Sequence, residues 1–376
     1  MSASPSEVLE RVQSELRAFW ATPPAPGETP KARACTRNLI VVGAEPEIAQ
    51  RWVAIVDEVL QVIPARAIVV GLDPDGPDSL EADTSAVCTP GEGGGPAVCS
   101  ERVQLTARGV LCERLASCVG TLSANDVPNT LVWLGRVHAN DPAFAPLAAD
   151  ADRIVLDAAQ GSLGGLAQVV RWAGARAPRE RPGVADLAWT RLAPWQELCA
   201  RMFDQPRLRE LAWRVSRVRI VQASAGMTAG GGALGSEGGL MLGWLATRLG
   251  WKATSLAGRL RLVREGDGAV QAQLRAEPAP GVARGSLLAV ELEATGDGVA
   301  MRGSVSRQAG DPDAATWRLE VTRAGDTHAI EQRVRLRAND PARLVESTLR
   351  RPAHDEVLAE AVAWADELRG EELACG

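Results

Sequence analysis

A glycine motif is the part of the sequence whose residue types and spacing come nearest to a chemical site. Gly230, Gly232 and Gly235 match the pattern GxGxxG. Between a strand and a helix, this pattern lets the backbone approach a phosphate at the helix N-terminus. The acidic residue expected about 20 residues later is missing, because residues 251–264 contain no Asp or Glu. The glycines also belong to a longer run, TAGGGALGSEGG, so a connecting segment is the simpler interpretation and phosphate binding a weak candidate role.

The side chains that commonly carry catalysis are sparse. None of the three histidines lies in a recognisable arrangement of nucleophile and base, and the sequence has no GxSxG or Walker A motif. His138 follows an apolar run in a loop, and Asp157 ends another such run, at the sheet edge where α/β proteins bind ligands. Incidental loop and capping roles explain both residues as well. The sequence therefore predicts no catalytic centre and no cofactor.

Seven cysteines are present, but no CxxC pair is among them. Metal sites normally need close Cys and His spacings, so we expect no metal site. Cys88, Cys99, Cys112 and Cys118 cluster in the sequence. They are either small buried apolar residues or include a redox-responsive pair, and in a reducing cytosol most thiols should be free.

Composition and charge exclude several classes of protein. The chain has 376 residues, of which 46% are hydrophobic, and its net charge is −6. Single cores stop growing at roughly 250–300 residues, so two domains are expected. The negative charge argues against a general nucleic-acid binder. No apolar stretch is long enough to span a bilayer, and the N-terminal residues lack the features of a signal peptide, so we expect a cytoplasmic protein without membrane contact.

The first half of the chain alternates buried strands with helices. The apolar runs 38–43 and 67–71 have the composition of strands covered on both faces, and residues 45–63 are typical of the helix between them. Residues 72–98 are rich in Asp, Pro and Gly and are interpreted as a surface loop. This alternation predicts an α/β domain over residues 1–180, with a mostly parallel sheet and helices on both of its faces.

The second half has a different pattern. A helical junction over residues 186–213 precedes a series of strands between residues 215 and 336, several of which are joined by short Gly/Asp turns. Short turns between alternating strands indicate antiparallel pairing. We therefore predict an α+β domain with an antiparallel sheet over residues 181–376, closed by C-terminal helices.

Residues 186–204, DLAWTRLAPWQELCARMFD, are the most distinctive segment. Proline fits the first turn of a helix but not its interior, so Pro194 predicts two helices that meet at Ala193. The two tryptophans and the arginines have two interpretations: they pack the domain junction, or they anchor a partner, because Trp and Arg dominate interface hot spots. Residues 171–219 support an acidic partner, with eleven Arg against five Asp or Glu. The candidate partner-binding residues are Trp189, Arg191, Trp195 and Arg201.

This segment resembles the signature D-L-x-W-x-R-L-x-P-W-x-E-L of the OpcA family, the glucose-6-phosphate dehydrogenase assembly proteins. Residues 243–251, GWLATRLGW, and residues 151–154, ADRI, are similar to further stretches of that family. Family members often carry Thr at the position of Ala193. Some members are redox-controlled through a C-terminal cysteine pair, but this sequence has only Cys375 there, so that control is not carried over.

The resemblance implies a non-catalytic assembly factor and allosteric activator. Such a protein binds glucose-6-phosphate dehydrogenase and promotes its active oligomer in the oxidative pentose phosphate pathway. The alternative is an enzyme or sensor that binds a sugar phosphate or nucleotide in the α/β domain, with the glycine motif, His138 and Asp157 as its first candidates.

Overall fold

The computed structural model describes residues 4–22, 29–91, 93, 95–224, 235–256, 259–264, 268–336 and 340–368. The chain folds as two compact units. The first comprises Met1–Gly161, Gln168–Asp186 and Pro341–His354, and the second comprises Ser162–Ala167, Leu187–Asp340 and Asp355–Gly376.

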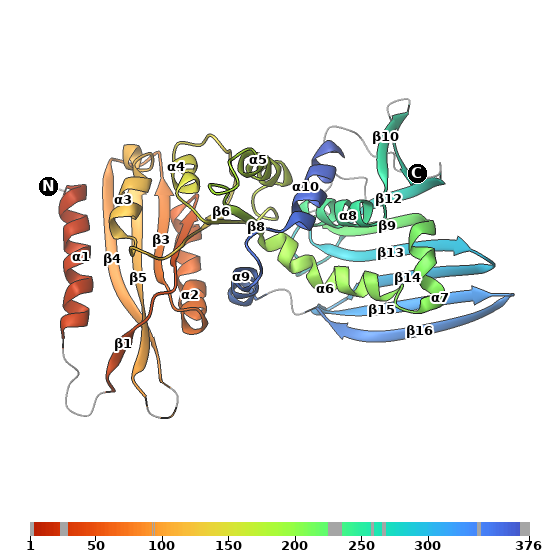
Figure 1. The fold of residues 1–376 in the computed structure, drawn as a ribbon, viewed down its shortest axis with the longest axis horizontal. Coiled ribbons are helices and arrows are strands. Elements are labelled where there is room, and N and C mark those ends of the chain that lie inside the picture. Colours follow the sequence, from red (N-terminus) through yellow and green to blue (C-terminus); the bar gives the residue numbers. More distant parts are fainter. Residues whose placement is uncertain are drawn as a thin grey trace. The chain divides into compact units, whose positions relative to one another are not determined.

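The first unit is built on an eight-stranded sheet (Figure 1). Seven strands are parallel, in the order β1-β5-β3-β2-β6-β7-β8, and β4 pairs with β5 in the antiparallel sense. This arrangement confirms the predicted, mostly parallel sheet. Its strands are β1 (Lys31–Arg33), β2 (Asn38–Gly43), β3 (Arg66–Asp73), β4 (Ser79–Thr89), β5 (Ala97–Arg108), β6 (Asn129–Leu134), β7 (Arg153–Leu156) and β8 (Gly183–Asp186).

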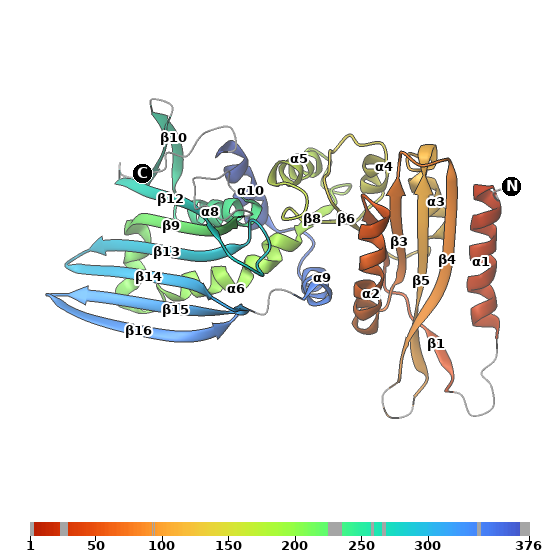
Figure 2. The same cartoon turned by 180° about the vertical axis from the view of Figure 1, so that it is seen from behind.

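Helices cover both faces of this sheet. Helix α1 packs on β4 and α3, whereas α2 packs on β2, β3 and α9, and α1 and α2 lie on opposite sides of the strands (Figures 1 and 2). A capping box in which Ser4 and Glu7 bind each other's backbone amides begins α1. The helical elements are α1 (Pro5–Ala21), α2 (Pro46–Val62), the 3-10 turn η2 (Gly109–Leu111), α3 (Leu115–Leu122), α4 (Phe144–Ala149), α9 (Pro341–Arg350) and α5 (Leu163–Gly174), whose residues up to Ala167 are assigned to the second unit.

The predicted surface loop over residues 72–98 is wrong. Eleven of its residues form β4, which pairs with β5 from Ser79 opposite Arg108 to Thr89 opposite Val98. The turn-forming residues lie at the two ends of this segment, and Leu80 and Ala82 between them are buried. Because loop-forming residues flank β4 on both sides, the whole segment has the average composition of a loop.

One cysteine pair of the predicted cluster is joined. Cys88 on β4 and Cys99 on β5 lie directly opposite each other with their Cα atoms 4.0 Å apart, and they form a disulfide. The expectation of free thiols is therefore wrong for this pair, because sequence spacing alone does not show which residues a hairpin places opposite each other. The expectation is confirmed for the other described cysteines, which are Cys35, Cys112, Cys118 and Cys199.

The second unit contains a mixed sheet in the order β10-β11-β12-β9-β13-β14-β15-β16. All neighbours are antiparallel except β9 and β12, so the predicted antiparallel sheet is confirmed. Its strands are β9 (Val215–Ser224), β10 (Lys252–Leu256), β11 (Arg259–Arg264), β12 (Gly268–Pro278), β13 (Leu287–Gly296), β14 (Val299–Gln308), β15 (Asp311–Arg323) and β16 (Asp326–Arg335).

The two faces of this sheet differ in polarity. Helix α6 packs on β14, α8 packs on β9, and α10 packs on α8, while Figure 2 shows the opposite side, where β13–β16 face the viewer. The buried side chains include Ile220, Leu292 and Met301. Ion pairs join Arg and Glu across neighbouring strands of the other face, as between Arg217 and Glu293. The helical elements are α6 (Leu187–Arg201), α7 (Pro206–Arg209), the 3-10 turn η3 (Glu210–Arg214), α8 (Ser236–Arg248) and α10 (Glu356–Glu367).

Candidate functional site

The first unit has a cavity of about 520 Å³ at the carboxyl ends of its parallel strands. Strands β3 and β6 flank β2, and the chain leaves β2 toward β3 but returns beside it as β6. This change of direction is the place where α/β sheets commonly bind ligands. The lining includes Ala44 after β2, Leu72 on β3 and Trp133 on β6, together with the polar side chains of Asp78, Glu113, Arg136 and Asp141.

The turn from β2 into α2 is poorly suited to a dinucleotide phosphate. Such a phosphate needs free backbone amides and a positive environment at the helix N-terminus. Here Glu45 is the N-cap residue, Pro46 lacks an amide hydrogen, and Glu47 adds a second carboxylate to the first turn. Gly43 serves packing, because a Cβ added to it would lie 2.7 Å from the amide nitrogen of Ala49. This corner therefore repels anions.

Acidic side chains in the cavity wall and next to it hold the surrounding loops in place. Asp78 accepts a hydrogen bond from the amide of Val110, and Asp141 accepts hydrogen bonds from the amides of Ala143 and Phe144 before α4. Asp73, at the end of β3, forms an ion pair with Arg108 at 3.3 Å. The cavity is thus concave and partly apolar, and two of its charged side chains, Asp78 and Asp141, are committed to the fold.

The two residues proposed for a ligand-binding alternative lie in different settings. His138 is exposed, and its carbonyl accepts a hydrogen bond from the amide of Asp141. Asp157 is buried, and its carboxylate accepts hydrogen bonds from the Ala159 amide and the Gln160 side chain. Neither residue lines the cavity at the carboxyl edge. Asp157 therefore has the geometry of a turn-stabilising residue.

Of the glycine motif, Gly230 and Gly232 lie outside the described residues. Gly235 is the N-cap residue of α8, and its amide donates a hydrogen bond of 2.9 Å to the side-chain oxygen of Gln222. A Cβ on Gly235 would lie 2.9 Å from the same oxygen. Phosphate binding by the motif stays a prediction.

The distinctive segment 186–204 folds differently from the prediction of two helices. Leu187–Arg201 is one helix, α6, with Pro194 inside it. An internal proline costs about 3 kcal/mol. Burial of Leu192, Trp195 and Leu198 on both sides of the proline offsets this cost and keeps the helix continuous.

The tryptophans of α6 pack inside the second unit. Trp195 is only 1% exposed, and the Arg307 guanidinium of β14 lies 5.7 Å from the centroid of its ring. Trp189 is 4% exposed, and its indole nitrogen donates a hydrogen bond of 2.9 Å to Asp355. Because Asp355 also caps α10 by accepting from the Leu358 amide, Trp189 connects α6 with the start of α10.

Arg191 belongs to a buried charged cluster. Its Nη1 atom lies 2.9 Å from Oε1 of Glu237 on α8, and Oε2 of Glu237 accepts a 2.9 Å hydrogen bond from the Leu287 amide of β13. The Arg307 Nε atom donates to the Leu287 carbonyl. Burial lowers the pKa of Arg307, and the nearby charge of Glu237 partly opposes that shift. The cluster therefore joins α6, α8, β13 and β14.

Arg201, at the end of α6, is the exposed member of the four candidates. Its guanidinium carbon lies 5.0 Å from the centroid of the Trp317 ring, and its Nη2 atom donates to Gln332 on β16. Trp317 in turn donates from its indole nitrogen to the Leu198 carbonyl. Contact of any of the four residues with a partner remains a prediction, and Arg201 is the one placed to make it directly.

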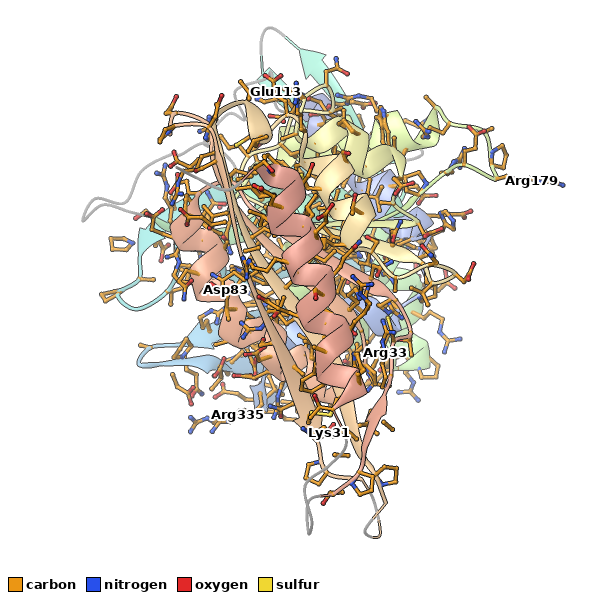
Figure 3. All side chains as sticks on the ribbon, turned by 90° about the vertical axis from the view of Figure 1, so that its left-hand side faces the viewer. Lys31, Arg33, Asp83, Glu113, Arg179 and Arg335 are labelled. Carbon is orange, nitrogen blue, oxygen red and sulfur yellow. A yellow bond between two sulfur atoms is a disulfide. The ribbon has the colours of Figure 1, made fainter. Side chains whose placement is uncertain are left out.

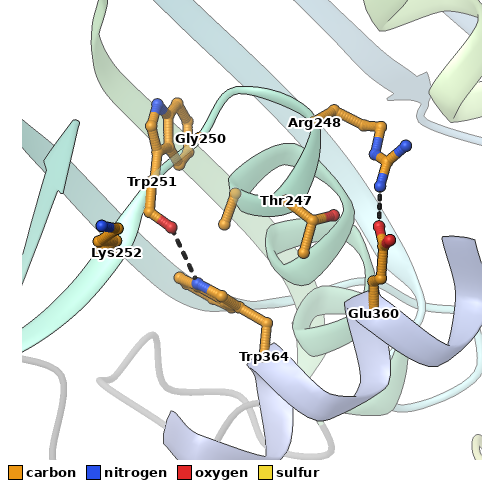
Figure 4. Close-up of a pocket in the computed structure, with 8 residues that line it drawn as sticks. Thr247, Arg248, Gly250, Trp251, Lys252, Glu360 and Trp364 are labelled. Carbon is orange, nitrogen blue, oxygen red and sulfur yellow. Dashed lines mark hydrogen bonds and ion pairs between the residues drawn. The ribbon is translucent and has the colours of Figure 1, made fainter. Parts of the chain in front are cut away.

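Residues 243–251, GWLATRLGW, contribute to the lining of an open cavity of about 490 Å³ in the second unit (Figure 4). Trp364 of α10 donates from its indole nitrogen to the Trp251 carbonyl, and Arg248 of α8 forms an ion pair with Glu360. The ion pair links α8 and α10, and the hydrogen bond links α10 to Trp251, which lies between α8 and β10. This segment therefore has a clear packing role.

Sequence reasoning missed an exposed aromatic side chain. Trp213, on η3, is 59% exposed, whereas the neighbouring Leu208 and Leu211 are buried. The sequence did contain a signal for this exposure. In the arginine-rich segment PRLRELAWR, Trp213 does not continue the spacing of the two leucines that face the core.

The described residues contain neither a candidate metal cluster nor a membrane-spanning helix. In that part of the chain, no three His, Cys, Asp or Glu side chains are grouped so that they could hold a metal ion. No helix there is both long and apolar enough to cross a bilayer.

Comparison with known proteins identifies the relatives of this chain. Residues 56–173 match the glucose-6-phosphate dehydrogenase subunit N-terminal domain, and residues 182–362 match the C-terminal domain of the same subunit. The OxPP cycle protein OpcA of Nostoc punctiforme is 27% identical over 257 residues, which cover 64% of this chain and 52% of that protein. The Synechocystis protein of the same name is 26% identical over 201 residues, which cover 52% of this chain and 39% of that protein.

This chain therefore spans about half the length, or less, of the curated relatives that it matches. Among solved structures, glucose-6-phosphate 1-dehydrogenase from Mycobacterium avium is similar with a TM-score of 0.52 and 13% identity, over 91% of this chain and 95% of that one. At this identity the likeness shows a shared fold alone. The two matched domains, in order along most of the sequence, show that the chain belongs to the OpcA family of glucose-6-phosphate dehydrogenase subunits.

Proposed function

We propose that this protein is a non-catalytic partner of glucose-6-phosphate dehydrogenase, which it binds and activates allosterically by favouring the active oligomer. The observation that carries the proposal is the match of both subunit domains, in sequence order, over residues 56–173 and 182–362. The names of the curated relatives connect them with the OxPP cycle. The proposed setting is therefore the oxidative pentose phosphate pathway in the cytoplasm.

The geometry of the first unit supports a docking role over hydride transfer. The corner between β2 and α2, where a dinucleotide phosphate would need amides and positive charge, carries Glu45, Pro46 and Glu47. An anionic cofactor would meet two carboxylates there. A protein that acts by binding another protein does not require a dinucleotide phosphate site at this corner.

Activation by binding alone has a simple physical basis. A partner that binds only the active assembly stabilises it by mass action, by about 2.7 kcal/mol when its concentration is 100 times its Kd. The equilibrium between inactive and active forms shifts by the same free energy. No group of this chain has to contact the reacting atoms.

The test is a kinetic titration. The dehydrogenase from the same cell is held at a low concentration, where its oligomer dissociates, and the initial rate of NADPH formation is measured as this chain is added. The proposal predicts a rate that rises and saturates, and no NADPH formation by this chain alone. An unchanged rate at all ratios, with no complex detected by gel filtration, would remove the proposal.

The cavity of about 520 Å³ at the carboxyl edge favours a second candidate, a small-molecule sensor or enzyme. The thermal unfolding of the isolated chain, measured with NADP or glucose 6-phosphate, separates the two candidates. A large increase in the melting temperature without the dehydrogenase would favour the second candidate. We expect no increase with either compound, because the corner near Glu45 and Glu47 repels anions.

A further inference from the structure

An exposed group of side chains lies on α7 and η3, apart from the contacts of α6 described above. The group, here named the tryptophan patch, consists of Arg207, Arg209, Trp213 and Arg214. Among the described residues, Trp213 is the only aromatic side chain classed as exposed, at 59% of its area. Tryptophan is highly buried on average, so this side chain leaves an apolar ring surface available for contact.

The backbone below this patch is firmly held. Leu208 and Leu211 are 2% and 3% exposed, so they anchor the segment in the core of the second unit. Arg214 forms a 3.1 Å ion pair with Asp297 in the turn between β13 and β14. A Cβ added to Gly296 would lie 2.5 Å from the Arg214 side chain, which shows how closely this arginine packs on that turn. Trp213 is therefore presented from a rigid base, which lowers the entropy lost on binding.

The patch is positively charged in a negatively charged chain. Residues 206–214 contain three arginines and only one acidic residue, Glu210, while the whole chain has a net charge of −6. Arg207 and Arg209 form no ion pair within the part of the chain that the structure describes. Arg209 ends α7 and Trp213 lies on the 3-10 turn that follows it, so both side chains belong to one short exposed segment. The guanidinium groups of Arg207 and Arg209 are therefore available to pair with a carboxylate of another protein.

We propose that the tryptophan patch is the surface that docks on glucose-6-phosphate dehydrogenase, at a site where an apolar pocket is surrounded by Asp and Glu. This inference rests on the proposed function and adds the contact surface to it. Trp213 fills the pocket and supplies most of the binding energy, since tryptophan and arginine dominate interface hot spots. Arg207 and Arg209 pair with the surrounding acids and speed association.

The experiment measures the binding of the dehydrogenase to four variants of the full chain by surface plasmon resonance. Trp213→Ala should raise the Kd about 30-fold, which is the loss expected for a hot-spot side chain. Arg207→Glu combined with Arg209→Glu should lower the association rate constant at least tenfold in low salt, and the difference should shrink at 0.5 M NaCl. Circular dichroism should be unchanged, because all three side chains are exposed.

Two matched variants serve as controls. Ile330→Ala removes another exposed apolar side chain, on β16, and Arg179→Glu reverses another exposed arginine, whose side chain points away from the ribbon in Figure 3. Both should bind within twofold of the wild-type chain. Equal losses in the controls and in the patch variants would overturn the patch as a specific surface.

The outcomes separate this inference from the function on which it rests. If the wild-type chain does not bind the dehydrogenase, the proposed function fails, and this surface fails with it. If the wild-type chain and Trp213→Ala bind with equal Kd, the surface alone is refuted. A wild-type chain that forms a dimer by itself, and loses the dimer on Trp213→Ala, would also refute it, since the patch would then bind a second copy.

Discussion

Replacement of Arg191 by methionine should destabilise the second unit strongly. Glu237 is buried, and its carboxylate is shared between the Arg191 guanidinium and the Leu287 amide. Arg191→Met removes the cation but leaves the buried carboxylate. Breaking a buried pair in this way costs about 3–5 kcal/mol. The lower end applies here, because the Leu287 amide and the nearby Arg307 still stabilise the charge.

The expected loss is therefore about 3 kcal/mol, equivalent to a fall in melting temperature of about 6–12 °C for a unit of this size. Urea unfolding followed by circular dichroism measures the free energy, and differential scanning calorimetry measures the temperature. Arg191→Met combined with Glu237→Gln should recover at least half of the loss, because the amide oxygen of glutamine can still accept from Leu287 without a buried charge.

Arg201→Ala is the matched control for this prediction. Arg201 lies on the same helix but is exposed, where it stacks on Trp317 and bonds Gln332. Its loss should cost no more than about 1 kcal/mol. If Arg191→Met unfolds within 1 kcal/mol of the wild type, Arg191 is not the structural residue described here. Unchanged stability together with lost dehydrogenase binding would instead establish Arg191 as a contact residue.

Three further predictions concern the cysteines and the proline of α6. Reduction of the Cys88–Cys99 disulfide should add two thiols to those that Ellman's reagent detects in the unfolded chain. It should also lower the free energy of unfolding by about 3 kcal/mol, because a cross-link restricts the unfolded chain. Superimposable urea curves with and without reductant would contradict this. Burial raises the pKa of the Cys199 thiol to about 12, so the stability that the thiol contributes is present below the pKa of the unfolded thiol and is lost as the pH rises toward 12. Between pH 8 and 10.5 the free energy of unfolding of the wild type should fall by roughly 2 kcal/mol more than that of Cys199→Ala. Equal decreases in the two proteins would show that burial does not protect this thiol. Pro194→Ala should keep α6 continuous and raise the free energy of unfolding by about 1–3 kcal/mol, whereas a decrease in helical circular dichroism would show that the proline is required for the helix.

The parallel sheet was predictable because its central strands are unusually clear in the sequence. Residues 38–43 and 67–71 are continuous apolar runs, each next to a helical segment, and only a strand covered on both faces needs such a run. The antiparallel sheet was predictable from its short turns, such as that at Gly296, Asp297 and Gly298. In both cases the local pattern and the tertiary environment require the same residue types.

Other features depend on partners that are distant in the sequence. The hairpin of β4 and β5 was missed because Asp, Pro and Gly surround it, and its disulfide became visible only when Cys88 and Cys99 were placed in register. Pro194 indicated a helix boundary, yet burial on both sides keeps α6 intact. The return of Pro341–His354 to the first unit has no counterpart in any local pattern.

The candidate contact residues illustrate the same limitation. Arginine and tryptophan at helical spacing are typical both of a core and of an interface, and only the partners of Arg191 and Trp189, which are Glu237 and Asp355, show that these side chains are used within the fold. Trp213 was missed because the signal in the sequence, its position outside the spacing of Leu208 and Leu211, is weak. Its exposure is a property of the folded chain.

Light scattering coupled to gel filtration provides the sharpest single test of this account. The dehydrogenase is measured alone and with an excess of this chain, at a concentration where the enzyme alone is partly dissociated. We predict one heavier peak that contains both proteins and the full dehydrogenase oligomer. Two separate peaks at the masses of the individual proteins would contradict the account.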